Sequence, residues 1–350
     1  MSNIQDEIAR RRTFAIISHP DAGKTTLTEK LLLFGGQIQV AGAVKSNKIK
    51  KTATSDWMEI EKQRGISVTT SVMEFDYEGY KINILDTPGF FDFAGEVFQA
   101  LRVSESGLIV VTAKGGVGVG TEKAWKQLST RKMPKMIYVS KIDEDNADYM
   151  SVLNAMREQF GISVVPVIVP VVEGGKNVGV YDMVSGKAYK MNGNKTEEMS
   201  VPASMEDDIA TYAEMLNENV AETSEELMDK FFGGEDFTYA EMIKGMHKGV
   251  IDHTLYPVLC GSGVTCLGSL MLMDHIIDLL PNPVEGNYHK ATTADGSVEE
   301  FIVSPGGVPS AFVFKTVSDQ RICVIICVAH IFCFQSIQNR ITETMSCNMN

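Results

Sequence analysis

Residues 18–25 read SHPDAGKT, and residues of these types at this spacing can bind a phosphate. They stand between an apolar run at 14–17 and a helical pattern at 26–33, which is the strand, loop and helix context that such a motif requires. Backbone N–H groups of the loop point at phosphate oxygens, Lys24 reaches the β- and γ-phosphates, and the Thr25 hydroxyl is a ligand for Mg²⁺. The loop therefore predicts a nucleotide site, with Ser18 standing where a first Gly is common.

A second apolar run, at residues 81–85, ends in the sequence DTPG. A carboxylate at the tip of a strand, here Asp86, can hold Mg²⁺ through water, and the N–H of Gly89 can meet a γ-phosphate. This motif therefore predicts that the same site contains a sensor of the γ-phosphate.

A Gly-containing segment with several hydroxyls, RGISVTT at 64–70, lies between these two motifs. Such a segment can close over Mg²⁺ and the γ-phosphate and let go after hydrolysis. Ser67 is its predicted ligand, which gives Thr25, Ser67 and Asp86 as the predicted metal-binding residues. The alternative is that Ser67 only begins a strand over residues 67–75.

The motif SKID, at 140–143, follows an apolar run and predicts which base is bound. A carboxylate such as Asp143 accepts hydrogen bonds from both the N1–H and the 2-amino group of guanine, which adenine does not have. The stem of Lys141 can lie over the plane of the base. Ser140 stands where Asn is usual, so we expect a weaker supporting hydrogen bond and a softened preference for guanine.

The last motif is GSG at 261–263, whose backbone can contact guanine O6. Short Gly-Ser turns are common, and this one is evidence for a nucleotide site because four motifs precede it in the right order.

The six expected core strands lie at 14–17, 67–75, 81–85, 107–112, 136–139 and 255–260. The predicted nucleotide-binding residues are Asp21, Ala22, Gly23, Lys24, Thr25, Thr26, Ser67, Asp86, Gly89, Ser140, Lys141, Asp143, Gly261, Ser262 and Gly263.

Composition bounds the partners and the compartment. The net charge of −13 argues against non-specific binding to nucleic acid, so we expect no DNA partner, and any RNA contact needs a local basic patch. The candidate patch is Lys45, Lys48, Lys50 and Lys51, with a solvated loop as the equal alternative.

Residues 1–12 carry no apolar run, so we expect no secretion signal and no membrane contact, and we predict a cytoplasmic protein. The six cysteines indicate neither a disulfide scaffold nor a zinc site.

Together these motifs resemble the translational GTPases, and the likeness divides at Gly89. Residues 1–89 closely resemble peptide chain release factor 3, through the phosphate loop, GGQI at 35–38, SDWME at 55–59 and QRGIS at 63–67. Residues 90–320 resemble a divergent elongation factor G, through FDF at 91–93, GTEKAW at 120–125, AETSEE at 221–226 and FVFKT at 312–316. A natural hybrid and an assembly join at a shared motif both explain this division.

The resemblance implies the fold and the domains. We expect an α/β fold over residues 1–283: a P-loop GTP-binding domain with a doubly wound, mostly parallel sheet and an α/β subdomain inserted at about 163–253. An incomplete β-barrel is expected over 284–320. The preferred explanation of 321–350 is a shifted reading frame that leaves an aberrant or disordered tail, and a membrane-interacting tail is the alternative.

The resemblance also implies GTP or GDP and Mg²⁺ as ligands, the ribosome as partner through its GTPase-associated region and ribosomal RNA, and a monomer. It implies GTP hydrolysis in termination or in elongation.

Members of this family usually carry a His directly after DTPG that orients the attacking water. This chain has Phe90 there, which has no hydrogen-bonding nitrogen. His19 is the nearest candidate for a substitute. The alternative functions are a GTP-binding module or a non-productive fragment with little hydrolysis, and an ATP-using enzyme, which Asp143 disfavours.

Overall fold

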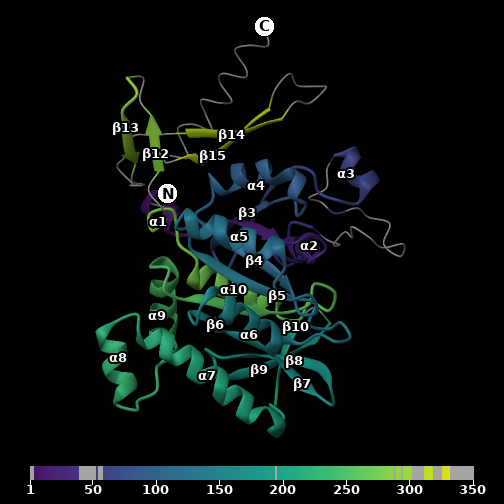
Figure 1. The fold of residues 1–350 in the computed structure, drawn as a ribbon, viewed down its shortest axis with the longest axis vertical. Helices are drawn as coiled ribbons and strands as arrows, with labels where there is room; N and C mark the ends of the chain where they lie inside the picture. The colour runs from purple at the N-terminus through teal and green to yellow at the C-terminus, as the bar shows by residue number, and fades with distance from the viewer. Residues whose placement is uncertain are drawn as a thin grey trace.

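A seven-stranded sheet with the strand order β2-β3-β1-β4-β5-β11-β6 forms the centre of the molecule (Figure 1). The computed structural model describes residues 4–38, 53, 58–193, 195–286, 289–292, 295–301, 311–317 and 325–331. The lysines of the candidate basic patch, at 45 to 51, lie outside these ranges.

All neighbouring strands in this sheet are parallel except β2, which is antiparallel to β3. The strands are β1 Arg11–Ser18, β2 Ser71–Tyr77, β3 Tyr80–Asp86, β4 Ser106–Thr112, β5 Lys135–Ser140, β6 Val164–Pro166 and β11 Tyr256–Cys260. The predicted α/β fold with a mostly parallel sheet is confirmed. The predicted number of six strands is wrong, because β6 has three residues and is too short to carry a period of its own.

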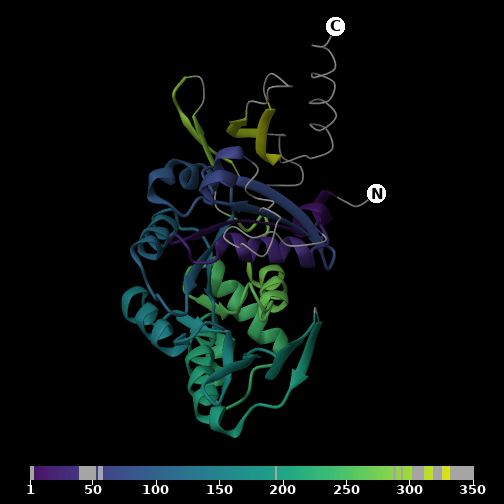
Figure 2. The same cartoon turned by 90° about the vertical axis from the view of Figure 1, so that its right-hand side faces the viewer.

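Helices cover both faces of this sheet, which explains why β4 and β5 are apolar and buried along almost their whole length. Helices α2 and α10 pack together behind the sheet, and α4, α5 and α6 lie on the opposite face (Figures 1 and 2). The helices outside the inserted subdomain are α1 Ile4–Ala9, α2 Lys24–Phe34, α3 Glu59–Arg64, the 3-10 turn η1 Phe91–Phe93, α4 Ala94–Leu101, α5 Val119–Thr130, α6 Tyr149–Phe160 and α10 Ser269–Leu279.

A subdomain with its own sheet lies between β6 and β11. Its four strands are antiparallel in the order β10-β9-β8-β7, and three helices follow them. The inserted elements are β7 Ile168–Glu173, β8 Lys176–Asp182, β9 Lys187–Asn192, β10 Lys195–Met199, the 3-10 turn η2 Ala203–Met205, α7 Glu206–Ala221, α8 Glu225–Phe232 and α9 Tyr239–Ile251. These elements fall within the predicted range of about 163–253, whose edges also take in part of the central sheet.

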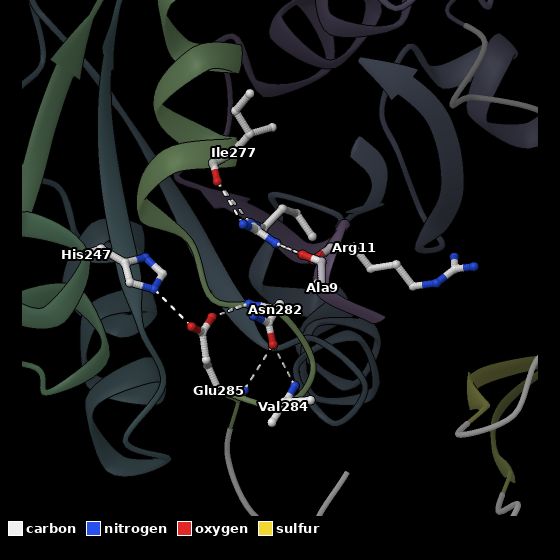
Figure 3. Close-up of polar contacts among 8 residues, drawn as sticks. Ala9, Arg11, His247, Ile277, Asn282, Val284 and Glu285 are labelled. Atoms are coloured by element: carbon white, nitrogen blue, oxygen red, sulfur yellow. Dashed lines mark hydrogen bonds and ion pairs between the residues drawn. The ribbon is translucent and has the colours of Figure 1, made fainter. Parts of the chain in front are cut away.

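The chain leaves α10 through a short linker that is fixed in place by side chains. Asn282 Oδ1 accepts hydrogen bonds from the N–H groups of Val284, at 2.9 Å, and of Glu285, at 3.3 Å. The Glu285 carboxylate accepts one from the N–H of Asn282 and lies 3.2 Å from Nε2 of His247 on α9 (Figure 3). The linker is therefore held against the inserted subdomain.

Beyond the linker, the described residues form two separate antiparallel pairs of strands. These are β12 His289–Thr292 with β13 Val298–Phe301, and β14 Ala311–Val317 with β15 Ile325–Ile331. Strand β15 lies within the segment that we expected to be an aberrant tail, and it pairs with β14. The domain limits 1–283, 284–320 and 321–350 stay predictions. Over the part of the chain that the structure describes, no helix is long and apolar enough to cross a bilayer.

Glu105, between α4 and β4, is a buried carboxyl, so we expect the stability of the fold to depend on pH. The residue is 3% exposed, and burial raises the pKa of its carboxyl from 4.5 to about 8. The folded state holds this proton more tightly than the unfolded state. The stabilisation that the protonated carboxyl gives to the fold is therefore complete below pH 4.5 and is lost as the pH rises to 8. We expect the free energy of unfolding of the wild type to fall by about 2–4 kcal/mol more than that of Glu105→Gln between about pH 5 and pH 8, measured by urea denaturation. Equal losses in the two proteins would contradict this assignment.

Candidate functional site

The predicted phosphate loop joins β1 to α2, and α2 begins at Lys24. Asp21 and Gly23 have left-handed backbone, with φ of 61° and 86°, which turns the chain sharply into the helix. The first N–H groups of a helix have no partner within the helix, so they are available to an anion. The loop therefore has the backbone of a phosphate site.

Lys24 and Asp86 come into contact at this loop. The ammonium group pairs with Asp86 Oδ1, and the two side chains are 6% and 1% exposed. Asp86 Oδ2 is buried and has no hydrogen-bond partner among the described residues. A buried carboxylate oxygen is costly unless a donor or a cation binds it, so this atom fits a ligand of Mg²⁺ through water. Thr25, the next residue after Lys24, is partly exposed at the start of α2.

The DTPG turn after β3 is fixed against β1 and the phosphate loop. Thr87 Oγ1 donates a hydrogen bond of 2.6 Å to the carbonyl of Ile16, and Thr87 is fully buried. A Cβ atom on Gly89 would lie 3.4 Å from Cα of Pro20, so the two backbones run side by side. The sequence analysis missed Thr87, although a hydroxyl directly after a strand-end Asp is a usable signal.

The SKID loop reaches the phosphate loop through Ser140. Its Oγ donates a hydrogen bond of 2.6 Å to the carbonyl of Ala22 and lies 3.1 Å from the carbonyl of Val111. Ser140 is 3% exposed. The serine hydroxyl at the end of β5 therefore joins the SKID loop to the phosphate loop, and the expected softening of the preference for guanine stays a prediction.

Lys141 and Asp143 belong to the same SKID loop as Ser140. Lys141 has left-handed backbone, with φ of 61°, and its Cε would lie 3.8 Å from a Cβ atom on Gly23. Its ammonium is 3.3 Å from the carboxylate of Glu144. Asp143 is exposed. The stem of Lys141 thus runs beside the phosphate loop, and the carboxylate of Asp143 is open to a ligand.

The GSG loop is packed between β5 and α2. A Cβ atom on Gly261 would overlap the Tyr138 hydroxyl, and one on Gly263 would lie 2.9 Å from Cγ2 of Thr26. Only glycine fits at these two positions without displacing a neighbour. Ser262 is fully buried, and its Oγ accepts hydrogen bonds of 3.1 Å from the N–H groups two and three residues further on. The serine side chain therefore stabilises the turn itself.

Ser67 lies in a segment whose backbone is held by acidic side chains. Glu61 of α3 is fully buried, and its carboxylate accepts hydrogen bonds from the N–H groups of Val68, at 2.9 Å, and Thr69, at 3.1 Å. These hydrogen bonds join the segment to Glu61 rather than to Lys24 or Asp86. The role of Ser67 as a metal ligand therefore stays a prediction. The sequence analysis missed Glu61, whose helical surroundings resemble any exposed acidic turn.

Phe90 follows the DTPG turn, and His19 lies in the phosphate loop. Phe90 directly precedes the turn η1 as its N-cap residue and is 36% exposed. The ring of His19 packs on the start of α5, where a Cβ atom on Gly120 would come within 2.9 Å of Nδ1. The ring centroid of Phe91 is 6.0 Å from that of His19. His19 therefore neighbours Phe91, and its catalytic role stays a prediction.

A known family accounts for most of the chain. The sequence profile described as "Elongation factor Tu GTP binding domain" matches residues 9–282. This chain belongs to that family. It is a GTP-binding domain of the translational GTPase type.

The fold is also similar to a crystal structure of a protein from Thermus thermophilus, with a TM-score of 0.80 and 33% sequence identity. The match covers 93% of this chain and 46% of the other, so the chain spans about half the length of that protein. It extends over both sides of Gly89, so a single relative accounts for both parts of the chain.

Removing the Ser140 hydroxyl tests the link between the two loops. Ser140→Ala leaves the carbonyl of Ala22 without this donor, and we expect the free energy of unfolding to fall by about 1–2 kcal/mol in guanidinium denaturation. Ser129→Ala, at an exposed position of α5, is the matched control and should stay within about 0.5 kcal/mol of the wild type. Equal stability of Ser140→Ala and the control would show that the bond contributes nothing.

Proposed function

We propose that this chain is the GTP-binding part of a translation factor that acts on the ribosome and hydrolyses GTP to GDP and phosphate. The observation that carries the proposal is the convergence of three motifs at one edge of the sheet. Lys24 pairs with Asp86, and Ser140 donates to the carbonyl of Ala22. Membership of the family supports GTP binding and hydrolysis.

The proposed binding mode follows from the donors and acceptors at this edge. The phosphates lie on the loop at 21–26, and guanine lies between the stem of Lys141, the carboxylate of Asp143 and the GSG backbone at 261–263. Thr25, Ser67 and Asp86 would hold Mg²⁺, which would neutralise negative charge on the phosphates. The unpaired Oδ2 of Asp86 supports this assignment among the described residues.

Elongation is the step of translation that we propose first. The larger part of the chain, residues 90–320, resembles elongation factor G, whereas the case for termination rests on the likeness of residues 1–89 to peptide chain release factor 3. The proposed partner is the ribosome, at its GTPase-associated region and ribosomal RNA, and the proposed location is the cytoplasm. We propose that the factor acts as a monomer.

A second candidate function is a GTP-binding module with little turnover. Phe90 favours it, because a partly exposed phenyl ring stands where the family usually has the imidazole that orients water. The two candidates share the binding site and differ only in the rate of hydrolysis.

Single-turnover GTP hydrolysis with and without ribosomes separates the two candidates. We expect the wild type to hydrolyse GTP slowly but measurably faster with ribosomes than without, whereas the second candidate shows no stimulation. We expect Phe90→His to raise the ribosome-stimulated rate by about 100-fold or more, because an imidazole there can orient the attacking water. Phe91→His is the matched control and should stay at the wild-type rate. A wild type as fast as Phe90→His would contradict the impaired switch, and a loss of that rate in His19→Ala would assign the role to His19.

The choice of base is tested at Asp143. Asp143→Asn removes an acceptor for two donors of guanine, so we expect the affinity for fluorescent GDP to fall by about 100-fold or more. Asp145→Asn, an exposed carboxylate two residues further on, is the control and should bind as the wild type does. Unchanged affinity in Asp143→Asn would show that another group reads the base.

A further inference from the structure

Lys315 on strand β14 is hydrogen-bonded to the segment that contains Ser67 and to helix α4. Its Nζ donates hydrogen bonds to the carbonyl of Thr70, at 2.7 Å, and to Oε2 of Glu96, at 3.0 Å. The Lys315 side chain is 10% exposed and that of Glu96 is 23% exposed. Both charges are therefore largely removed from water and depend on each other.

Glu96 also binds Thr70 directly. The same Oε2 accepts a hydrogen bond of 2.7 Å from the N–H of Thr70, and Thr70 Oγ1 donates one of 3.1 Å to the carbonyl of Glu96. Thr70 ends the segment that contains Ser67, and Glu96 lies on α4 directly after the DTPG turn and η1. The two segments assigned to the γ-phosphate thus meet at one carboxylate, and Lys315 joins both.

A second side chain of β14, Phe314, packs against the GTP-binding domain. Phe314 is 9% exposed and belongs to the hydrophobic core of the GTP-binding domain. The apolar contact positions the strand, and the neighbouring ammonium then meets its two acceptors. Strand β14 and helix α4 are in direct contact.

We propose that Lys315 is a positioning residue that couples the two γ-phosphate segments to β14. The proposal rests on the proposed GTP binding, since it assigns those segments to the nucleotide. One ammonium can serve Thr70 and Glu96 only while both segments keep this arrangement: movement of Glu96 removes its counter-charge, and movement of Thr70 removes its carbonyl acceptor. A nucleotide that orders both segments therefore also fixes β14, and by linkage the position of β14 changes the preference for GTP over GDP.

Hydrogen exchange measured by mass spectrometry on the full chain tests the coupling without any nucleotide. Lys315→Met keeps the aliphatic stem and removes the charge. We expect peptides covering 66–70 and 94–101 to exchange at least about fivefold faster than in the wild type. Lys187→Met is the matched control, because it breaks an exposed pair with Glu198 in the inserted sheet and should leave both peptides unchanged.

Titration with fluorescent GDP and with a non-hydrolysable GTP analogue tests the link to the nucleotide. We expect Lys315→Met to lower the affinity for the analogue relative to GDP by about fivefold or more. Glu96→Gln keeps an oxygen acceptor for the Thr70 amide and removes the counter-charge of Lys315, so it should have the same effect. The double variant should change the ratio no more than the larger single variant does.

Wild-type exchange rates in both peptides of Lys315→Met and Glu96→Gln would overturn the proposal. Equal falls in both affinities, with an unchanged ratio, would show a structural role only and would overturn it too. If Lys315→Met does not unfold cooperatively, Glu96→Gln decides the matter alone. If the wild type binds neither nucleotide, the proposed function fails, while the exchange comparison still decides whether Lys315 holds the two segments.

Discussion

The carbonyl of Ala22 and the ammonium of Lys24 are the two points from which the phosphate loop is held. Ser140 donates to the carbonyl from β5, and Asp86 pairs with the ammonium from β3. Asp21 and Gly23 have left-handed backbone, a conformation that Gly adopts freely and Asp more readily than most residues. The strand order places β1 between β3 and β4, with β5 next, so Asp86 on β3 and Ser140 on β5 reach the loop from opposite sides of β1. The DTPG and GSG turns also pack close to this loop, since Gly89 lies beside Pro20 and Gly263 beside Thr26.

Carboxylates organise the segments around the proposed γ-phosphate position by binding backbone rather than ligand. Glu61 accepts two amides of the Ser67 segment, and Glu96 accepts the amide of Thr70. A charged acceptor strengthens such bonds, and its burial makes them costly to break. These bonds hold the segments in the arrangement seen in this structure, and through Lys315 they connect it to β14.

Local motifs could be predicted from the sequence, and contacts between distant residues could not. The strand, loop and helix around Lys24 lie within a short stretch, so their residue types and spacing suffice. The same holds for the strands that end at Asp86 and Ser140. Glu96 and Lys315 are 219 residues apart, and although Lys315 lies in the FVFKT motif, nothing in that motif points to Glu96, so only the folded chain brings them together. Strand β6 was missed because three residues carry no periodic pattern.

Isothermal titration calorimetry of the wild-type chain with GDP and with ADP, each with Mg²⁺, tests the central claim most directly. If the loops at the edge of the sheet form a guanine nucleotide site, one GDP binds per chain and ADP at the same concentration gives no binding heat. Binding of ADP with the affinity of GDP would contradict the role assigned to the SKID loop. Binding of neither nucleotide would contradict the site as a whole.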